Sequence, residues 1–309
     1  MENCAVTHIQ ACPGCGTRSE NVSLGRGSAF STSSGGQSYE HPDYEIHECK
    51  SCGILYKNRT ISESTLTEYY SHVDFTKWEI PGLFPTERRA LAELEKLTLG
   101  SRILDFGCSS GRLLSALRPG YQRFGIELNQ TAAREAESKG ITMLSFANLD
   151  DEAPFDAVVL VDVFEHLADP SSILARLAKR LRPHGKLILV TGDGDNSLCR
   201  RLPAEFWYFR NVEHLCMLTR RFADHLATTI PLQLVGWERV SHYDSTHFNR
   251  VCDYARVFAY LQCQSKTILW RLILQFAPFL GRASHWQNCP AYDQGADHIV
   301  GVFVRSVPV

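Results

Sequence analysis

The sequence predicts an α/β domain built on a mostly parallel sheet and preceded by a small metal-binding module. From residue 101 onward, short apolar runs alternate with segments of helical periodicity, a pattern typical of a parallel sheet covered by helices. Before that point, four of the eleven cysteines form two closely spaced pairs. The chain has 309 residues, which is long enough for one large domain and one small module.

The two cysteine pairs predict a structural zinc site. Cys12 with Cys15, and Cys49 with Cys52, form C-x2-C turns that are each followed by glycine. Such a turn lets two thiolates converge on one ion, so two turns predict a closed tetrahedral site for Zn²⁺. Reduced thiols or a single redox pair are the alternatives. A Gly/Ser-rich stretch, residues 25–38, lies between the pairs, and we expect it to form a loop.

Hydrophobic periodicity divides the chain into three parts. We expect a zinc-binding module over residues 1–60, a helical linker or cap over 61–98, and an α/β domain over 99–309. The predicted strands are residues 102–106, 123–127, 141–144, 157–161, 186–191, 232–240 and 298–305. The predicted helices between them are residues 111–117, 131–138 and 171–181. Residues 241–297 are interpreted as an insertion on the substrate side, with a dimer interface or simple packing as alternatives.

Composition excludes several classes of function. The net charge of −2 provides no global basic field for nucleic acid or an anionic membrane. The N-terminus lacks the basic and apolar regions of a secretory signal, so we expect a cytoplasmic protein. The most apolar stretch, residues 268–280, is too short for a transmembrane segment and contains Arg271. We expect a buried or amphipathic helix there.

One motif predicts a nucleoside-binding site. The apolar strand ending at Asp105 is followed by a turn with Gly107 and Gly111 that opens a helix. Glycine lets the backbone approach a ligand closely, and a helix N-terminus offers free N–H groups to a carboxylate. The next strand ends at Glu127, whose carboxylate can accept hydrogen bonds from ribose hydroxyls. The spacing differs from the G-x-G-x-x-G fingerprint of nicotinamide dehydrogenases.

Several segments together resemble the class I S-adenosylmethionine (SAM)-dependent methyltransferases. They are ILDFGCSSGRLL, FGIELN, FDAVVLVDVFEHLADP, LRPHGKLILVTGD, WYFRNVEHLCMLT and DHIVGVFVR. The leading CPGCG, HECKSCGILY and STLTEYY resemble the N-terminal region of a bacterial group in which a cysteine-pair module precedes the catalytic domain. The resemblance covers nearly the whole chain except about residues 241–297. It implies a Rossmann-like sheet of seven strands with helices on both faces and the last strand antiparallel.

The resemblance also implies positions for the cofactor. It places Asp105, the turn Gly107–Cys108 and Gly111 around the methionine part of SAM. Further contacts would be Glu127 and the adjoining Leu128 at the ribose, Asn148 and Leu149 beside the adenine, and Asp162 near the transferable methyl group. Many relatives have a third glycine where this chain has Ser109.

Two histidines are the candidate catalytic residues. His166 follows the fourth predicted strand, at the sheet edge where ligands bind in such folds, and the resemblance puts it close to the methyl group. His214 lies after the fifth strand, in a segment that usually faces the same pocket. Each could act as a base that removes a proton from the acceptor, or could only shape the pocket wall.

The leading hypothesis is methyl transfer from SAM to a small-molecule or glycan acceptor, more readily at oxygen than at nitrogen or carbon. One alternative is a methyltransferase that acts on RNA or protein, but residues 1–60 mix basic and acidic residues and give no strong nucleic-acid signal. A SAM-binding scaffold without catalysis is the other alternative. A homodimer is compatible with the sequence.

Overall fold

The computed structural model of the chain describes residues 6–18, 21–34, 37–78, 80–211, 213–264 and 296–306. The apolar stretch 268–280, expected to be helical, lies outside these ranges. So do the other residues from 265 to 295, which make up more than half of the segment 241–297. Among the helices within the described ranges, none is long and apolar enough to cross a membrane.

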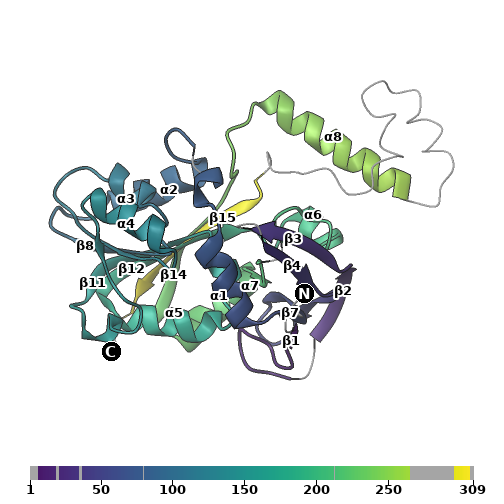
Figure 1. The fold of residues 1–309 in the computed structure, drawn as a ribbon, viewed down its shortest axis with the longest axis horizontal. Coiled ribbons are helices and arrows are strands. Elements are labelled where there is room, and N and C mark those ends of the chain that lie inside the picture. Colours follow the sequence, from purple (N-terminus) through teal and green to yellow (C-terminus); the bar gives the residue numbers. More distant parts are fainter. Residues whose placement is uncertain are drawn as a thin grey trace.

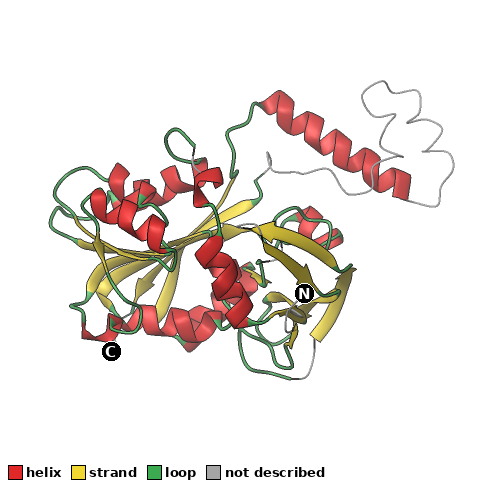
Figure 2. Ribbon diagram, viewed as in Figure 1, coloured by secondary structure: helices red, strands yellow, loops and turns green. Residues whose placement is uncertain are grey.

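A seven-stranded sheet forms the centre of the α/β domain (Figures 1 and 2). Its order is β10-β9-β8-β11-β12-β15-β14, and the first five strands are parallel. Only β15, the last strand along the chain, runs antiparallel to its neighbours β12 and β14, as the family resemblance implies. The strands are β8 (Arg102–Phe106), β9 (Gln122–Ile126), β10 (Thr142–Met143), β11 (Phe155–Val161), β12 (Leu181–Gly192), β14 (Leu232–Val240) and β15 (His298–Arg305). Every strand that the sequence predicts in this domain is confirmed.

Both faces of the sheet are buried, which explains the continuous apolar runs of the central strands. On β11, Ala157 and Val159 pack with one helical layer, whereas Val158 and Leu160 face the other. The domain's helices are α2 (Pro85–Leu94), α3 (Arg112–Ala116), α4 (Gln130–Ser138), α5 (Pro170–Lys179), α6 (Ser197–Arg201), α7 (Arg220–Thr229) and α8 (His247–Gln264). Residues of α2, α3 and α4 cover the first face, and residues of α5 and α7 cover the second.

Short turns of 3-10 helix lie at the sheet's edge and in the linker. They are η1 (Phe75–Trp78), η2 (Leu149–Asp151) and η3 (Phe164–His166). Here α1 (Glu63–His72) and η1 make residues 61–78 largely helical, whereas α2, which lies within the expected linker 61–98, packs against the large sheet. Figure 1 shows α1 between the large sheet and the N-terminal strands, and α8 projecting away from both.

The N-terminal part is mostly strand. Its elements are β1 (Val6–His8), β2 (Asn21–Gly27), β3 (Phe30–Ser34), β4 (Gln37–His41), β5 (Tyr44–Cys49), β6 (Leu55–Lys57) and β7 (Arg59–Ile61). The expectation of a loop over residues 25–38 was wrong, because most of this stretch lies in β2, β3 and β4. Here β3 and β4 pair antiparallel as a hairpin, and the Phe, Thr and Tyr side chains between the serines suit a strand.

The N-terminal part and the α/β domain share one sheet. The strand β13 (Cys216–Met217), which belongs to the later part of the chain, pairs antiparallel with β6 in a four-stranded sheet of order β13-β6-β5-β2. Lys57 in β6 also donates its backbone N–H to the Leu215 carbonyl (2.9 Å). The segment that follows the candidate catalytic His214 is therefore held directly by the N-terminal part.

Candidate functional site

The glycine turn after β8 has the geometry that close backbone approach requires. Gly107 and Gly111 have φ angles of 82° and 77°, in the left-handed region that favours glycine. A Cβ on Gly107 would lie 2.5 Å from Cγ2 of Val163, and one on Gly111 would collide with Ile141. The backbone N–H groups of Gly107 and Cys108 donate to the Ile126 carbonyl (2.8 and 3.1 Å), which ties the turn to the end of β9.

Ser109 occupies the same turn with a φ of 47°. It therefore keeps the left-handed conformation at the position where many relatives have glycine. A non-glycine residue in this region costs about 1–2 kcal/mol. The turn thus has the shape expected for cofactor binding, with some backbone strain at this serine.

Asp105, the last but one residue of β8, is a buried carboxylate that lacks a compensating charge. Only 3% of the residue is exposed, and its Oδ1 atom has no hydrogen-bond partner. Burial, reinforced by the carboxylates of Glu87 and Glu127, raises the pKa of Asp105 to about 8. A cation placed here would stabilise the ionised form. The ammonium of the methionine part of SAM has the charge that fits this carboxylate.

Glu127 follows β9 and is held by the backbone on both sides. Its Oε2 accepts a hydrogen bond from the Ser109 N–H (2.9 Å), and its Oε1 accepts one from the Asn129 N–H (2.7 Å). Each carboxylate oxygen retains a second lone pair. The carboxylate is thus oriented beside the glycine turn and can still accept bonds from two ribose hydroxyls.

The remaining expected cofactor contacts differ in exposure. Leu128 and Asn148 are exposed, whereas Leu149 and Cys108 are buried. Leu149 belongs to the hydrophobic core, so only its backbone could face an adenine. Asn148 follows β10 at the carboxyl edge of the sheet. Its role stays a prediction.

The two candidate catalytic histidines lie together. The rings of His166 and His214 have centroids 4.7 Å apart, and their Nε2 atoms lie 3.6 and 4.0 Å from Oε1 of Glu165. The hydroxyl of Tyr70, in α1, lies 2.6 Å from Nδ1 of His166. Glu165 is fully buried and accepts hydrogen bonds from Thr191 (2.7 Å) and the Tyr208 hydroxyl. We call these residues the histidine cluster: Tyr70, Glu165, His166, Tyr208 and His214.

The two histidines have different environments. His214 is buried, and its Nδ1 lies 2.5 Å from the Tyr208 carbonyl, which can only accept a hydrogen bond. This contact fixes the tautomer with the proton on Nδ1. Burial, together with the nearby His166 and Lys57, lowers the pKa of His214 well below its usual range, so the ring stays neutral. The side chain of His166 is 20% exposed and is the more accessible of the two.

Asp162 links the histidine cluster to a second group of residues. It follows β11 with a φ of 51°, and its Oδ1 lies 2.9 Å from the same Tyr208 hydroxyl, whose one proton is shared between Asp162 and Glu165. His298 lies beside the same Oδ1, and His242 lies beside Oδ2. Burial raises the pKa of Asp162, but the contacts with His298 and His242 outweigh burial and lower it below its usual range.

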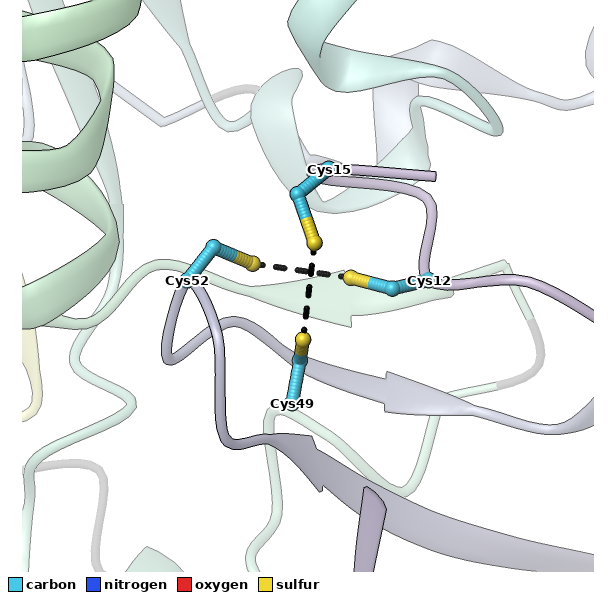
Figure 3. Close-up of side chains that lie close together, drawn as sticks. All are labelled: Cys12, Cys15, Cys49 and Cys52. Atoms are coloured by element: carbon cyan, nitrogen blue, oxygen red, sulfur yellow. Dashed lines mark hydrogen bonds between the residues drawn. The ribbon is translucent and has the colours of Figure 1, made fainter. Parts of the chain in front are cut away.

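The four module cysteines converge on one point (Figure 3). The Sγ atoms of Cys12 and Cys52 are 3.5 Å apart, those of Cys15 and Cys49 are 3.6 Å apart, and all four lie within 4.8 Å of one another. A tetrahedral zinc with Zn–S bonds of 2.3 Å places its sulfurs about 3.8 Å apart. The cysteine geometry therefore fits a Zn²⁺ ion.

The cysteine turns pack closely against α7. A Cβ on Gly14 would lie 2.6 Å from Cε2 of Phe222, and Thr219 donates to the Gly53 carbonyl (2.9 Å). Cys12 and Phe222 belong to the same hydrophobic cluster as the sheet's second face. An ion at the cysteines would thus brace the interface between the two parts of the chain.

Sequence reasoning missed several residues of this region. Tyr208 and Tyr70 appear in the sequence only within segments that resemble the family, and His298 receives no role there. His298 begins the antiparallel strand β15, so it lies at the edge where the parallel strands end. The available signal was the pair Asp297–His298 before an apolar strand. Placing this pair at the site required knowledge of the direction in which that strand runs.

Comparisons with known proteins agree with this geometry. Residues 83–235 match a family model described as a methyltransferase domain. The ubiquinone biosynthesis O-methyltransferase of Xanthomonas oryzae pv. oryzae is 31% identical over 153 residues, which are 45% of this chain and 61% of the relative. The enzyme of the same name from Methylococcus capsulatus is 30% identical over 152 residues, covering 45% and 62%. The chain thus spans about three fifths of the length of these relatives.

A solved structure shares the fold. The magnesium protoporphyrin IX methyltransferase of Synechocystis, determined with bound S-adenosylhomocysteine, aligns with a TM-score of 0.51 and 14% sequence identity, over 79% of this chain and 100% of that one. The fold and the glycine turn are those of a Rossmann-like α/β protein. Together with the family model over residues 83–235 and the O-methyltransferase relatives, they indicate a class I SAM-dependent methyltransferase.

Proposed function

We propose that the protein transfers a methyl group from SAM to an oxygen atom of a small-molecule or glycan acceptor. One observation carries the proposal: the glycine turn with Asp105 and Glu127 lies at the same sheet edge as the histidine cluster. The name of the relatives, O-methyltransferase, supports oxygen as the acceptor atom. SAM, when bound, supplies an electrophilic methyl group on a sulfonium centre.

On the cofactor side, the residues of the glycine turn, Asp105 and Glu127 bind SAM and orient it. The carboxylate of Asp105, whose Oδ1 has no hydrogen-bond partner, pairs with an ammonium group, and Glu127 accepts hydrogen bonds from ribose hydroxyls. The turn at Gly107 and Gly111 lets the backbone come close to the ligand. Positioning is the main contribution to an in-line displacement, so these contacts are expected to dominate the rate as well as the affinity.

On the acceptor side, His166 is the proposed base. It is the accessible histidine, and the carboxylate of Glu165 lies 3.6 Å from its Nε2. When the acceptor hydroxyl becomes an ether, its proton moves to His166, and Glu165 stabilises the resulting imidazolium. Tyr70 holds Nδ1 of the ring. The buried, neutral His214 packs beside Glu165, with its Nε2 4.0 Å from Oε1 of that carboxylate.

The decisive experiment is calorimetric titration with SAM, followed by transfer of a labelled methyl group to a panel of hydroxylated small molecules and sugars. His166→Asn should lower turnover about 100-fold or more, the usual contribution of a general base, with SAM affinity unchanged. His184→Asn is the matched control, because His184 is exposed and has a φ of 64° that asparagine tolerates. Absence of SAM binding, or full activity of His166→Asn, would contradict the proposal.

We also infer that the four cysteines bind a structural Zn²⁺, within a module that spans residues 1–60. Their sulfur spacing and burial support this ligand set. Four thiolates complete the tetrahedral coordination and leave no position for a substrate. The ion therefore stabilises the module and, through β6 and β13, the segment that carries His214. The segments 61–98 and 99–309 are the corresponding linker and methyltransferase domain.

A further inference from the structure

A second group of possible metal ligands lies beside the histidine cluster. Asp162 follows β11, His242 follows β14, and His298 begins β15. One ligand atom from each lies within 4.8 Å of the others. Nε2 of His298 is 3.4 Å from Oδ1 of Asp162, and Nδ1 of His242 is 3.9 Å from Oδ2. His298 and His242 each face one oxygen of Asp162 at a distance longer than an ordinary hydrogen bond, and their two imidazole rings stack with centroids 4.6 Å apart.

The two imidazole nitrogens that face this point lack partners. Nε2 of His298 and Nδ1 of His242 are both buried and make no hydrogen bond within the described part of the chain. His298 is fully buried, and His242 is 9% exposed. Leaving a buried polar atom unpaired costs about 1–3 kcal/mol. Two such atoms aimed at one carboxylate indicate a site that a cation would complete.

The neighbouring carboxylate of Asp297 holds His298 in the tautomer that can bind a metal ion through Nε2. Nδ1 of His298 lies 3.0 Å from Oδ1 of Asp297, so the ring donates there and keeps its Nε2 lone pair towards Asp162. A carboxylate behind a ligating histidine is a recurrent feature of metal sites. Asp297 also accepts hydrogen bonds from the His242 N–H (3.0 Å) and from Nε1 of Trp207 (3.2 Å). One carboxylate therefore orients the His298 ring directly and holds the backbone N–H of His242.

Ligand type and spacing limit which ion fits. Two imidazoles and one carboxylate suit Mn²⁺, Fe²⁺, Co²⁺ or Zn²⁺ better than Mg²⁺ or Ca²⁺, which prefer oxygen. Ligands about 2.1 Å from an ion lie about 3.0–3.4 Å apart in octahedral or tetrahedral arrangements. The separations of 3.4 and 3.9 Å thus require only a small contraction around the ion.

The geometry points to a divalent transition-metal site formed by Asp162, His242 and His298. Three protein ligands leave coordination positions open, and the side chain of Asp162 is 30% exposed, so an oxygen of the acceptor can reach the ion. This use of the ion rests on the proposed methyl transfer, whereas metal binding itself does not. The ion would polarise the acceptor hydroxyl and favour loss of its proton to His166. The hydroxyl of Tyr208 connects the two groups through Asp162 and Glu165.

The test is titration of the zinc-loaded full chain with Mn²⁺, followed by electron paramagnetic resonance in the absence of SAM and acceptor. Thiolates select zinc over manganese, so Mn²⁺ reports the nitrogen and oxygen site. We expect one Mn²⁺ per chain. His242→Asn and His298→Asn should each weaken its binding at least tenfold, and the exposed control His184→Asn should not. Equal binding by the wild type and both variants would overturn the proposal.

Pulsed measurements on the wild type keep the proposal testable if a variant fails to fold. Couplings from two imidazole nitrogens to the bound Mn²⁺ are expected. Binding without nitrogen couplings, or no saturable binding, would show that an ion pair with a protonated His298 occupies the site instead. The outcome is independent of methyl transfer: a protein that binds Mn²⁺ but not SAM would contradict the proposed function and leave this site intact.

Discussion

Lys57 provides the sharpest test of how the N-terminal part supports the site. Its side chain is fully buried, its Nζ lies 4.7 Å from the ring centre of Tyr44, and it donates a hydrogen bond to the Asn211 carbonyl (2.5 Å). Asn211 belongs to the segment that carries His214. Burial lowers the pKa of Lys57 to about 7, although the carboxylate of Glu213 acts in the opposite direction.

This lowered pKa makes stability depend on pH. The unfolded chain holds the lysine proton up to a pKa of about 10.4, whereas the folded chain releases it near pH 7. The unfolded state therefore binds more protons in between, and the free energy of unfolding rises with pH. The slope approaches about 1.4 kcal/mol per pH unit above pH 7, or ~2 kcal/mol between pH 7 and pH 9. Below pH 7 both states are protonated and this dependence disappears.

Urea unfolding at several pH values measures the effect. Lys57→Met removes the titrating amine and keeps an unbranched side chain, so its stability should lack this rise. The difference between wild type and variant cancels the titration of other groups, including the cysteine thiols. Lys179→Met, at an exposed position, should follow the wild-type profile. Parallel profiles for wild type and Lys57→Met would refute the assignment of a buried, largely neutral lysine.

Four further changes test other parts of the molecule. Glu127→Ala should weaken SAM binding by about 1.5–3 kcal/mol, the contribution of hydrogen bonds to a charged group, and calorimetry giving an unchanged dissociation constant would refute the ribose contact. Cys49→Ser should abolish stoichiometric zinc and expose the module to proteolysis, because metal binding there provides folding free energy on the order of 10 kcal/mol; retained zinc would argue against the ligand set. Ser109→Gly should raise the unfolding free energy by up to about 1 kcal/mol by relieving the left-handed φ, whereas thermal denaturation at an unchanged or lower temperature would contradict the strain. Tyr70→Phe should reduce turnover and shift the pH–rate profile without changing SAM affinity, since it removes only the hydroxyl at His166; an unaltered profile would assign Tyr70 a packing role.

Local patterns were sufficient for much of the fold. The apolar runs that form β8 and β11 are buried on both faces of the sheet, and Gly107 adopts a positive φ that favours glycine. Both features could be predicted from a few consecutive residues. The same holds for the C-x2-C turns, whose sulfurs converge as expected. The stretch 25–38 misled because serine and glycine suggest a loop, whereas cross-strand pairing of β3 with β4 outweighs that local preference.

The amino-acid sequence alone was enough to predict the α/β architecture, the nucleoside turn and the cysteine site, because their signals act between residues that are close along the chain. The surroundings of His166 were decided by the tertiary structure, since Tyr70 and His214 reach it from segments far away along the chain. His298 joins Asp162 only because β15 runs antiparallel and starts at the carboxyl edge of the parallel strands. Strand order and direction result from the packing of the whole chain, and no local pattern encodes them.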